Sequence, residues 1–529
     1  MPRRGLETIE YLRKQVVAFR PIGGMVSTNP GRTLPPGASP DMVNCSVFQG
    51  MLVKRPGYTQ YRAGNASIGG AVTGLFSTQD VEDNTHLIAL HSTGGRRYES
   101  SSASWAALTG PAMTGNSTLL FSFENSENKI VWSQGLDQVM VLSPITGTAY
   151  AVLAAACPPA KFLCRFNNRL NLGMTVESAV TFPYRHRRPV SGDHTDWSGL
   201  GSGFRDQAEF PYHMRGLRKL GLNMCIYYER TIEACIAQPQ ATAPFRYETR
   251  IADVGLYAAF TLKGRNDLHF FLGNDNFYMF NGSQVKAIGN TIRDVIFSTL
   301  NPGELRRMFA EMLLDTQEYV AFLVTGSATQ PNVAWVYNWD REVWYPWDID
   351  GPLCSTIHRL DDTLTIDELV GTIDQQSWQF DSRNMLSSYP AFLTGNDDGK
   401  IYLWSPTYPG DGGVAISCRW TSQDFTSENV FSMPGRKLTL NRLTTEYAGV
   451  GIAFTLSFYF STDGGATWVG PYTFTGTAAN SGFYTATIDR RVTADRIRFK
   501  FTHSSATEIF RISNFELEFE LQDTQEYAA

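Results

Sequence analysis

The sequence predicts an all-β chain, on the strength of three observations. Aromatic residues make up 13% of the 529 residues and charged residues only 18%, a balance that favours strands and shared surfaces because helical proteins carry more Lys and Glu. Short apolar runs separated by Gly, Asn, Asp and Pro recur between about residues 70 and 410. A turn-forming phrase also occurs twice, and each copy leads into an aromatic or alternating stretch.

The repeated phrase predicts a strand, a turn and a second strand. Its two copies span residues 273–280 and 395–404, and a degenerate version spans 134–142. Repetition of such hairpins in an all-β chain predicts radially arranged antiparallel sheets, and we therefore expect a β-propeller over residues 61–410. Turn formation explains the acids of the phrase better than catalysis or Ca²⁺ binding, because no twelve-residue calcium loop is present. These acids are Asp275, Asp397 and Asp398.

Residues 1–60 are expected to form a short helix and an extended arm. The stretch from Gly23 to Tyr58 is rich in Pro, Gly and Asn, which predicts little regular structure. No apolar leader and no run of ~18 apolar residues is present, so we expect synthesis in the cytoplasm and no membrane insertion. Apolar residues at helical spacing predict the helix over residues 5–17: Ile9, Leu12 and Val16.

Two further elements are expected within and after the propeller. The helical spacing of apolar residues over 291–312 predicts two short helices, broken at Asn301-Pro302-Gly303, as an inserted appendage for packing or assembly. After a turn-rich loop the chain alternates strongly, as in Phe515 to Leu521, where apolar residues face one way and glutamates the other. Residues 411–529 therefore predict an antiparallel β-sandwich with one face in water.

The cysteines predict buried thiols rather than a metal centre. They are scattered through apolar stretches without CxxC spacing, and no pair of histidines accompanies them. We therefore expect no metal and no other cofactor. The seven cysteines are Cys45, Cys157, Cys164, Cys225, Cys235, Cys354 and Cys418.

One basic run stands out in an otherwise acidic chain. The net charge of −6 gives no general attraction to nucleic-acid phosphates. The run is Arg185-His186-Arg187-Arg188, and a solvated or subunit-facing loop is the favoured interpretation. Contact of Arg185, Arg187 and Arg188 with a phosphate backbone stays open as an alternative.

Catalytic signatures are missing from the sequence, and we do not expect an enzyme. Neither HExxH, GxSxG nor a P-loop is present. Carboxylates cluster between Asp361 and Asp381, but a tandem of Thr-Ile-Asp turns at residues 365–367 and 372–374 favours capped loops over a pair of catalytic acids. The histidines are dispersed, and the nearest pair of interest, His186 and His194, is interpreted as structural.

Two motifs bear on sugar recognition. Residues Ser461 to Trp468 match the Asp-box pattern S-x-D-x-G-x-T-W, which forms a hairpin turn in sialidases and many other β proteins. The motif is specific as a turn and weak as an activity. The stretch 335–347 holds four tryptophans, and Trp339 and Trp344 are candidates for stacking on sugar rings, although packing in an aromatic hairpin with a turn at 338–342 is favoured.

Several stretches, taken in order, point to one family. The first is the arm from Gly24 to Tyr58, which ends in Lys54-Arg55-Pro56-Gly57-Tyr58. The others are 168–170 leading to 196–199, 228–232 leading to Gly255, 270–281 leading to Ile288-Gly289, and the Thr-Ile-Asp tandem. Over residues 20–410 this order resembles the β-propeller tail nozzle, or packaged-DNA stabilisation (tail hub), proteins of short-tailed bacteriophages.

The resemblance implies a structural protein of the phage tail. Such a subunit forms a homo-oligomeric ring, typically hexameric, below the portal and the adaptor (head-to-tail connector) of the virion. The ring extends the DNA channel, helps to retain the packaged DNA and carries tail tip, fibre or spike proteins. Double-stranded DNA passes through the lumen without sequence-specific binding, and an acidic subunit with few charges suits that passage. The N-terminal helix and the Asp-box domain do not map onto the family.

A receptor-recognition protein is the alternative function. The Trp-rich stretch and the Asp box favour a glycan-binding or glycan-cleaving propeller, which is also a tail protein but acts through a sugar site.

Overall fold

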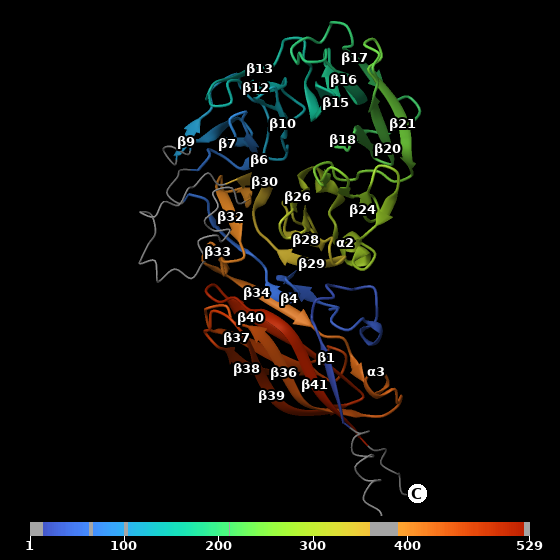
Figure 1. The fold of residues 1–529 in the computed structure, drawn as a ribbon, viewed down its shortest axis with the longest axis vertical. Helices are drawn as coiled ribbons and strands as arrows, with labels where there is room; N and C mark the ends of the chain where they lie inside the picture. The colour runs from blue at the N-terminus through green and yellow to red at the C-terminus, as the bar shows by residue number, and fades with distance from the viewer. Residues whose placement is uncertain (1–13, 63–66, 100–103, 211, 360–389, 523–529) are drawn as a thin grey trace, which may run out of the picture.

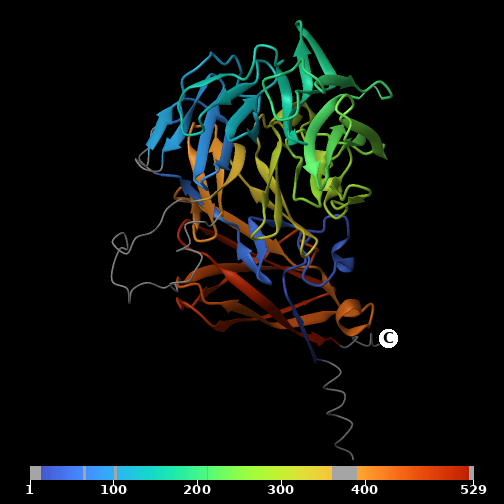
Figure 2. The same cartoon turned by 45° about the horizontal axis from the view of Figure 1, so that its top comes forward.

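Strands dominate the computed structural model, which describes residues 14–62, 67–99, 104–210, 212–359 and 390–522. The all-β prediction is confirmed. Two regions lie one above the other in Figures 1 and 2. The upper region, the sheet array, consists of small four-stranded units. The lower region, the two-layered region, consists of a six-stranded sheet packed face to face on the larger part of an eleven-stranded sheet, whose other end belongs to the array.

The sheet array contains, within the described residues, six separate four-stranded antiparallel sheets and a seventh four-stranded unit, the seventh sheet, which is one end of an eleven-stranded sheet. In the first six, four consecutive strands pair in chain order. In the seventh, three consecutive strands pair in order and the last of them pairs with β5 (Gly57–Gln60) from the N-terminal part of the chain. A single parallel pairing joins β5 to β33 (Gly410–Asp411) of the lower region. The strands of the first three sheets are β6 (Val72–Gln79), β7 (Thr85–His91), β8 (Gly94–Glu99) and β9 (Ser104–Ala107); β10 (Ser122–Ser126), β11 (Lys129–Ser133), β12 (Met140–Leu142) and β13 (Tyr150–Val152); β14 (Ala160–Phe166), β15 (Arg169–Glu177), β16 (Val180–Arg188) and β17 (Gly203–Asp206). Those of the other four are β18 (Met214–Leu220), β19 (Asn223–Tyr228), β20 (Thr231–Ala237) and β21 (Phe245–Ala252); β22 (Lys263–Gly264), β23 (His269–Leu272), β24 (Phe277–Phe280) and β25 (Val285–Ala287); β26 (Phe309–Leu313), β27 (Glu318–Leu323), β28 (Val333–Asn338) and β29 (Val343–Asp348); β30 (Pro352–Arg359), β31 (Pro390–Asn396), β32 (Ile401–Ser405) and β5.

The first strands of neighbouring sheets contact one another. β6 contacts β10 of the second sheet and β30 of the seventh, and the pairs β10 with β14, β14 with β18, β22 with β26 and β26 with β30 are also in contact. Figure 1 shows the sheets following one another in chain order until the seventh lies beside the first. Small hydrophobic clusters fill the spaces between neighbours, and Ile88 and Leu142 share one such cluster between the first and second sheets.

The two-layered region buries an aromatic core between its sheets. Trp420 and Phe499 of one layer contact Phe515 of the other at ring-centroid distances of 5.6 and 5.2 Å. Phe515, Leu517 and Phe519 are buried while Glu516 is exposed, as the alternation predicted. One layer is β3 (Cys45–Phe48), β4 (Met51–Lys54), β41 (Arg511–Leu521), β36 (Leu438–Ala448) and β39 (Phe483–Ala494), with β1 (Lys14–Phe19) on β41. The other is β33 (Gly410–Asp411), β34 (Val414–Thr421), β40 (Arg496–Ser505), β37 (Phe454–Ser461) and β38 (Val469–Gly476), with β2 (Met42–Val43) on β34 and β35 (Phe425–Thr426) on β40.

Residues 14–60 contribute strands to both regions, so two expectations for the N-terminal segment are wrong. Residues 14–17, assigned to a helix, begin β1, which pairs antiparallel along β41; the rest of the expected helix lies outside the described residues. Val16 and Val17 are β-branched, and a strand edge was available to them. The arm contributes β2, β3, β4 and β5, because its backbone groups find partners on the edges of both regions.

The expected helical insertion is present but shorter than the periodicity indicated. It consists of α2 (Arg293–Thr299) and the 3₁₀ segment η3 (Pro302–Arg307), and Asn301 separates them by accepting the Gly303 N–H on its side chain at 3.1 Å. Residues 309–312, assigned to the second helix, belong to β26, whose residues are buried on both faces. The remaining helical segments among the described residues are η1 (Gly31–Thr33) and α3 (Ser427–Phe431).

Each copy of the repeated phrase connects the second strand of a sheet to the third. The connections are β11 to β12, β23 to β24 and β31 to β32. Asp275 Oδ1 accepts the Tyr278 hydroxyl at 2.7 Å, and Asp398 accepts the Lys400 N–H at 3.0 Å. Asp397 holds its turn through the backbone, by donating its N–H to Gly351 O at 3.1 Å. The assignment of Asp275 and Asp398 to turn formation is confirmed.

Candidate functional site

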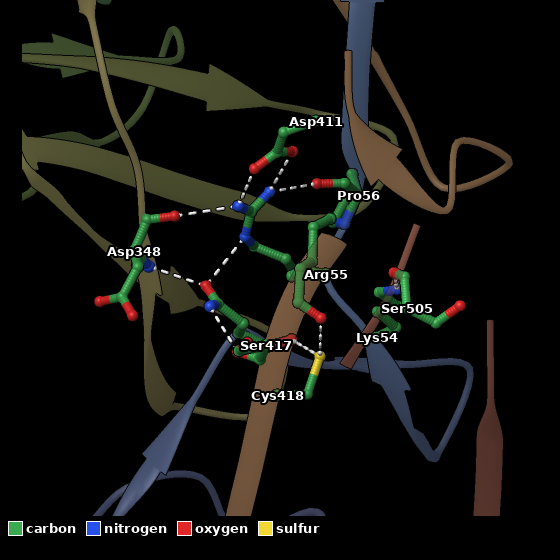
Figure 3. Close-up of polar contacts among 10 residues, drawn as sticks. Lys54, Arg55, Pro56, Asp348, Asp411, Ser417, Cys418 and Ser505 are labelled. Carbon is green, nitrogen blue, oxygen red and sulfur yellow. Dashed lines mark hydrogen bonds and ion pairs between the residues drawn. The ribbon is translucent and has the colours of Figure 1, made fainter. Parts of the chain in front are cut away.

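The joint between the two regions is built around Arg55 (Figure 3). β4 ends at Lys54 and β5 begins at Gly57, so Arg55 lies where the chain passes from the two-layered region to the sheet array. Its side chain is 3% exposed, and all five of its N–H donors have partners. Nε donates to Asn44 Oδ1 at 2.8 Å, Nη1 to Pro56 O at 2.9 Å and Asp411 Oδ1 at 3.0 Å, and Nη2 to Asp348 O at 3.0 Å and Asp411 Oδ2 at 2.5 Å.

Asn44 completes the joint from the N-terminal side. Its Oδ1 also accepts the Asp348 N–H at 2.8 Å, and its Nδ2 donates to Ser417 O at 2.7 Å. The φ of Asn44 is 56°, in the left-handed region that Asn tolerates better than most residues. Asp348 ends β29 of the sixth sheet and Ser417 lies in β34, so one amide group contacts both regions.

Lys54 and Cys418 extend the joint into the two-layered region. Lys54 Nζ donates to Ser505 O at 2.6 Å and to Glu508 O at 2.9 Å, and burial lowers the pKa of this ammonium group. The Cys418 thiol donates to Asn44 O at 3.2 Å. Both side chains are buried.

This arrangement fixes the geometry of the joint. A bidentate guanidinium–carboxylate pair has a fixed orientation, and the carbonyl partners of Arg55 hold it further. Because all five donors of Arg55 are already used, none is left to bind a substrate. The joint therefore holds the two regions in one relative position.

The first strands of all seven sheets line one cavity of about 580 Å³. Polar contacts cross between neighbouring sheets along this lining. Arg165 N donates to Glu124 Oε2 at 3.0 Å between the third and second sheets, and Arg218 Nη2 donates to Gly264 O at 3.1 Å between the fourth and fifth. On the other side, Lys263 Nζ and Ser355 Oγ donate to Glu311 Oε2 at 3.0 and 3.1 Å, and Ser77 N donates to Thr356 Oγ1 at 3.3 Å. We call this the axial cavity.

The basic run lies in strand β16, so its assignment to a loop is wrong. Its arginines contact side chains of the same chain. Arg185 pairs with Asp206 at 2.6 Å, and its guanidinium lies 3.7 Å from the ring centroid of Phe182 and 3.9 Å from that of Phe204. Arg187 pairs with Glu177 at 3.0 Å. The Arg188 guanidinium lies 5.7 Å from the Phe245 centroid. Because these arginines already have acidic and aromatic partners, the structure gives little support to phosphate contact.

The tryptophans form the predicted aromatic hairpin. β28 and β29 pair antiparallel with Tyr337 opposite Trp344. Trp344 is 1% exposed, and its indole N–H donates to Ile288 O at 2.7 Å. Trp339 is partly buried and stacks on Phe270 at 5.7 Å between ring centroids. The packing interpretation is confirmed for Trp344, and a buried ring with its polar atom satisfied is not a platform for sugar.

The histidines of interest occupy internal positions. His186 lies between the Tyr247 hydroxyl at 2.8 Å and Asn171 Oδ1 at 3.0 Å, and burial lowers its pKa to about 3. His194 Nδ1 contacts Ser126 Oγ. All seven cysteines are free and buried, as predicted. The carboxylates between Asp361 and Asp381 and the Thr-Ile-Asp tandem lie outside the described residues.

The Asp box forms the expected turn between β37 and β38. Asp463 Oδ1 accepts the Thr467 N–H at 2.9 Å and the Ser461 hydroxyl at 2.7 Å. These bonds, first that from the Thr467 hydroxyl, hold the pKa of Asp463 well below its usual range. Among the described residues no group of three His, Cys, Asp or Glu side chains is placed to hold a metal ion, and no helix is long and apolar enough to span a membrane.

Sequence reasoning did not identify the joint as a site. Lys54 and Arg55 belong to the phrase that resembles the nozzle family, and nothing else in the sequence singles them out. Apart from Asn44 and Pro56, their partners lie about 300 to 450 residues further along the chain. The one available signal was a Lys-Arg pair that follows an apolar stretch and precedes Pro and Gly.

Comparison with known proteins adds little to these observations. No protein-family model matches the chain, and no curated protein matches it. Among solved structures, the chain is similar to the computationally designed Ika8 protein at 9% sequence identity, over 69% of this chain and 95% of that chain, with a TM-score of 0.33.

Proposed function

We propose that the chain is a ring-forming structural subunit of a phage tail nozzle. The observation that carries the proposal is the joint, because the Lys54-Arg55-Pro56-Gly57-Tyr58 phrase of the family resemblance supplies the residues that fix one region to the other. A subunit that must withstand the pressure of packaged DNA needs such a connection. The protein is proposed to act without catalysis or a cofactor.

The finer architecture belongs to the same proposal. The seven sheets are blades of one β-propeller, the axial cavity is its centre, and β5 completes the last blade from the N-terminal part of the chain. Support comes from the contacts between first strands, from the lining of one cavity by all seven of them, and from the pairing of β32 with β5. The two-layered region is the C-terminal β-sandwich, extended by strands of the arm.

The DNA channel is proposed to lie between subunits. A cavity of about 580 Å³ has the size of a small-molecule pocket, so a duplex cannot pass through the centre of one subunit. A homo-oligomeric ring, typically hexameric, would enclose the lumen instead, below the portal and the adaptor. The ring would help to retain packaged DNA in the virion and carry tail tip, fibre or spike proteins.

The glycan-recognition alternative loses support from the burial of Trp344 and from the turn chemistry of the Asp box. Electron microscopy and sedimentation velocity of the purified protein test the nozzle proposal. We expect closed rings with a central lumen. A chain that stays monomeric at high concentration, and that binds an immobilised glycan array, would favour the alternative.

A further inference from the structure

The axial cavity concentrates positive charge in an acidic chain. The whole sequence has 45 Lys and Arg against 51 Asp and Glu. The cavity lining reverses this balance, with the acidic residues Glu124 and Glu311 facing a larger basic set: Arg165, Arg218, Lys219, Lys263 and Arg265. A concave site with walls of one charge raises the local concentration of the opposite ion.

The two sides of the cavity differ in how their charges are neutralised. Lys263 is paired with Glu311 at 3.0 Å, and Arg265 is paired with Asp267 at 2.7 Å. Within the described residues, Arg165 and Lys219 have no acidic partner within ion-pair distance, and Arg218 donates one hydrogen bond, to Gly264 O. The surplus of positive charge therefore lies on the third and fourth sheets.

Glu124 is the carboxylate of the cavity lining that lies on the second sheet, next to the third. Burial raises the pKa of the Glu124 carboxyl, whereas the Arg165 backbone N–H, which donates to Glu124 Oε2 at 3.0 Å, and the charges of Arg218 and Arg165 lower it. One carboxylate against Arg165, Arg218 and Lys219 leaves the positive charge in excess. Guanidinium groups bind carboxylate and phosphate oxygens in a bidentate manner.

We propose that the axial cavity binds a small multivalent oxyanion, of the phosphate or polycarboxylate type, between Arg165, Arg218 and Lys219. The volume of about 580 Å³ admits such a ligand beside its bound water. The site lies within one chain, so it does not depend on ring formation or on the function proposed above. Bound anion stabilises the contacts between the second, third and fourth sheets.

Isothermal titration calorimetry with inorganic phosphate, pyrophosphate and citrate tests the site at low chloride concentration. We expect saturable binding that Arg218→Gln weakens about tenfold or more, since the bond between ionised groups is lost. Lys219→Gln, which changes an exposed residue, serves if Arg218→Gln fails to fold, and we expect weaker binding there as well. Glu124→Gln should strengthen binding because it removes the opposing charge from the same cavity.

Arg491→Gln is the matched control, since Arg491 is an exposed cation of the two-layered region. Its binding should equal that of the unaltered chain. Absence of binding by all three anions would overturn the proposal. So would equal weakening by Arg491→Gln and Arg218→Gln, which would indicate diffuse attraction, or a change of the same sign in Glu124→Gln and Arg218→Gln. Preference for citrate over the two phosphates, or the reverse, identifies the type of oxyanion.

Discussion

The two regions of the molecule bury their apolar residues in different ways. Between the first five sheets the array has separate small clusters, each shared by two neighbours. The two-layered region has one continuous cluster, which also reaches the fifth, sixth and seventh sheets. The array is thus made of local units joined by small cores and polar contacts, whereas the lower region depends on strands from both ends of the chain. A core substitution in the array should therefore destabilise only the neighbouring sheets, whereas a core substitution in the two-layered region should destabilise both layers.

The largest effect is expected at the centre of the continuous core. Phe515 is fully buried and its ring contacts those of Trp420 and Phe499. Phe515→Ala should cost about 3–5 kcal/mol of unfolding free energy, measured by urea denaturation. Hydrogen exchange should show lost protection in both layers. Leu172→Ala, at an equally buried site of the array, is the matched control and should lose protection only in the second and third sheets. Equal spread in both variants would contradict the comparison.

The joint should couple the two regions. Arg55→Met leaves the Asp411 carboxylate without its bidentate partner and removes one of the two donors to Asn44 Oδ1, and removing one member of a buried pair should cost about 3 kcal/mol. We expect the urea transition to split in two as the regions unfold separately. Arg442→Met breaks the exposed pair with Asp489 and should leave a single transition. A single transition of Arg55→Met at the urea concentration of the unaltered chain would show that Arg55 does not couple the two regions.

Glu318 should give the core a pH dependence. Burial raises the pKa of this carboxyl to about 7, so the folded state keeps a proton that the unfolded state releases. Stability should therefore fall as pH rises from the ordinary carboxyl range to about 7, by on the order of 3 kcal/mol, and depend no further on this group above that pH. Glu318→Gln should flatten this slope in unfolding curves between about pH 5 and 8. A slope unchanged in that variant would assign it to other groups.

A polar contact of the array should matter less than the aromatic core. Glu311 accepts bonds from Lys263 and Ser355 across two boundaries between sheets. Glu311→Ala should cost about 1–3 kcal/mol through the unpaired donors, with exchange protection lost in the fifth to seventh sheets. Glu311→Gln keeps an acceptor and should cost less than Glu311→Ala. An equal cost in the two variants would show that charge, not hydrogen bonding, holds this boundary.

The Asp box should have the smallest effect, because its turn is at the surface. Asp463→Ala removes the acceptor of the Thr467 N–H, so the exchange of that amide should accelerate while the thermal unfolding midpoint stays unchanged. Asp463→Asn keeps an acceptor and should preserve the protection. A fall in the midpoint comparable to that of Phe515→Ala would contradict this ranking and would mean that the turn contributes to the stability of the lower region as much as its core does.

Local patterns in the sequence predicted the local structure well. The repeated phrases gave three hairpins, the Trp-rich stretch gave β28 and β29, and the alternation after Phe515 gave a strand with one buried face. Residues 14–17 and 309–312 were assigned to helices but form strands. Helical spacing over a few residues is a weak signal, and pairing with an available strand edge outweighs it. Tertiary pairing, not local preference, decided both.

Long-range contacts were beyond the reach of sequence patterns. The arm looked irregular because Pro and Gly separate its strands, yet β3 and β4 pair with each other and β4 pairs with β41, more than 400 residues away. The same distance hid the partners of Arg55 and the meeting of seven first strands at one cavity. Arg185 and Trp344 became candidate site residues because of their residue types. In the structure both are buried and their polar atoms have partners within the chain.

A reconstruction of virions that carry this chain tests the central claim most directly. The account predicts a closed ring of identical subunits on the tail axis below the adaptor, each with the sheet array and the two-layered region held at the Arg55 joint, and a lumen between subunits. A virion without this chain on its tail axis, or one in which it occurs only as isolated peripheral copies, would contradict the account.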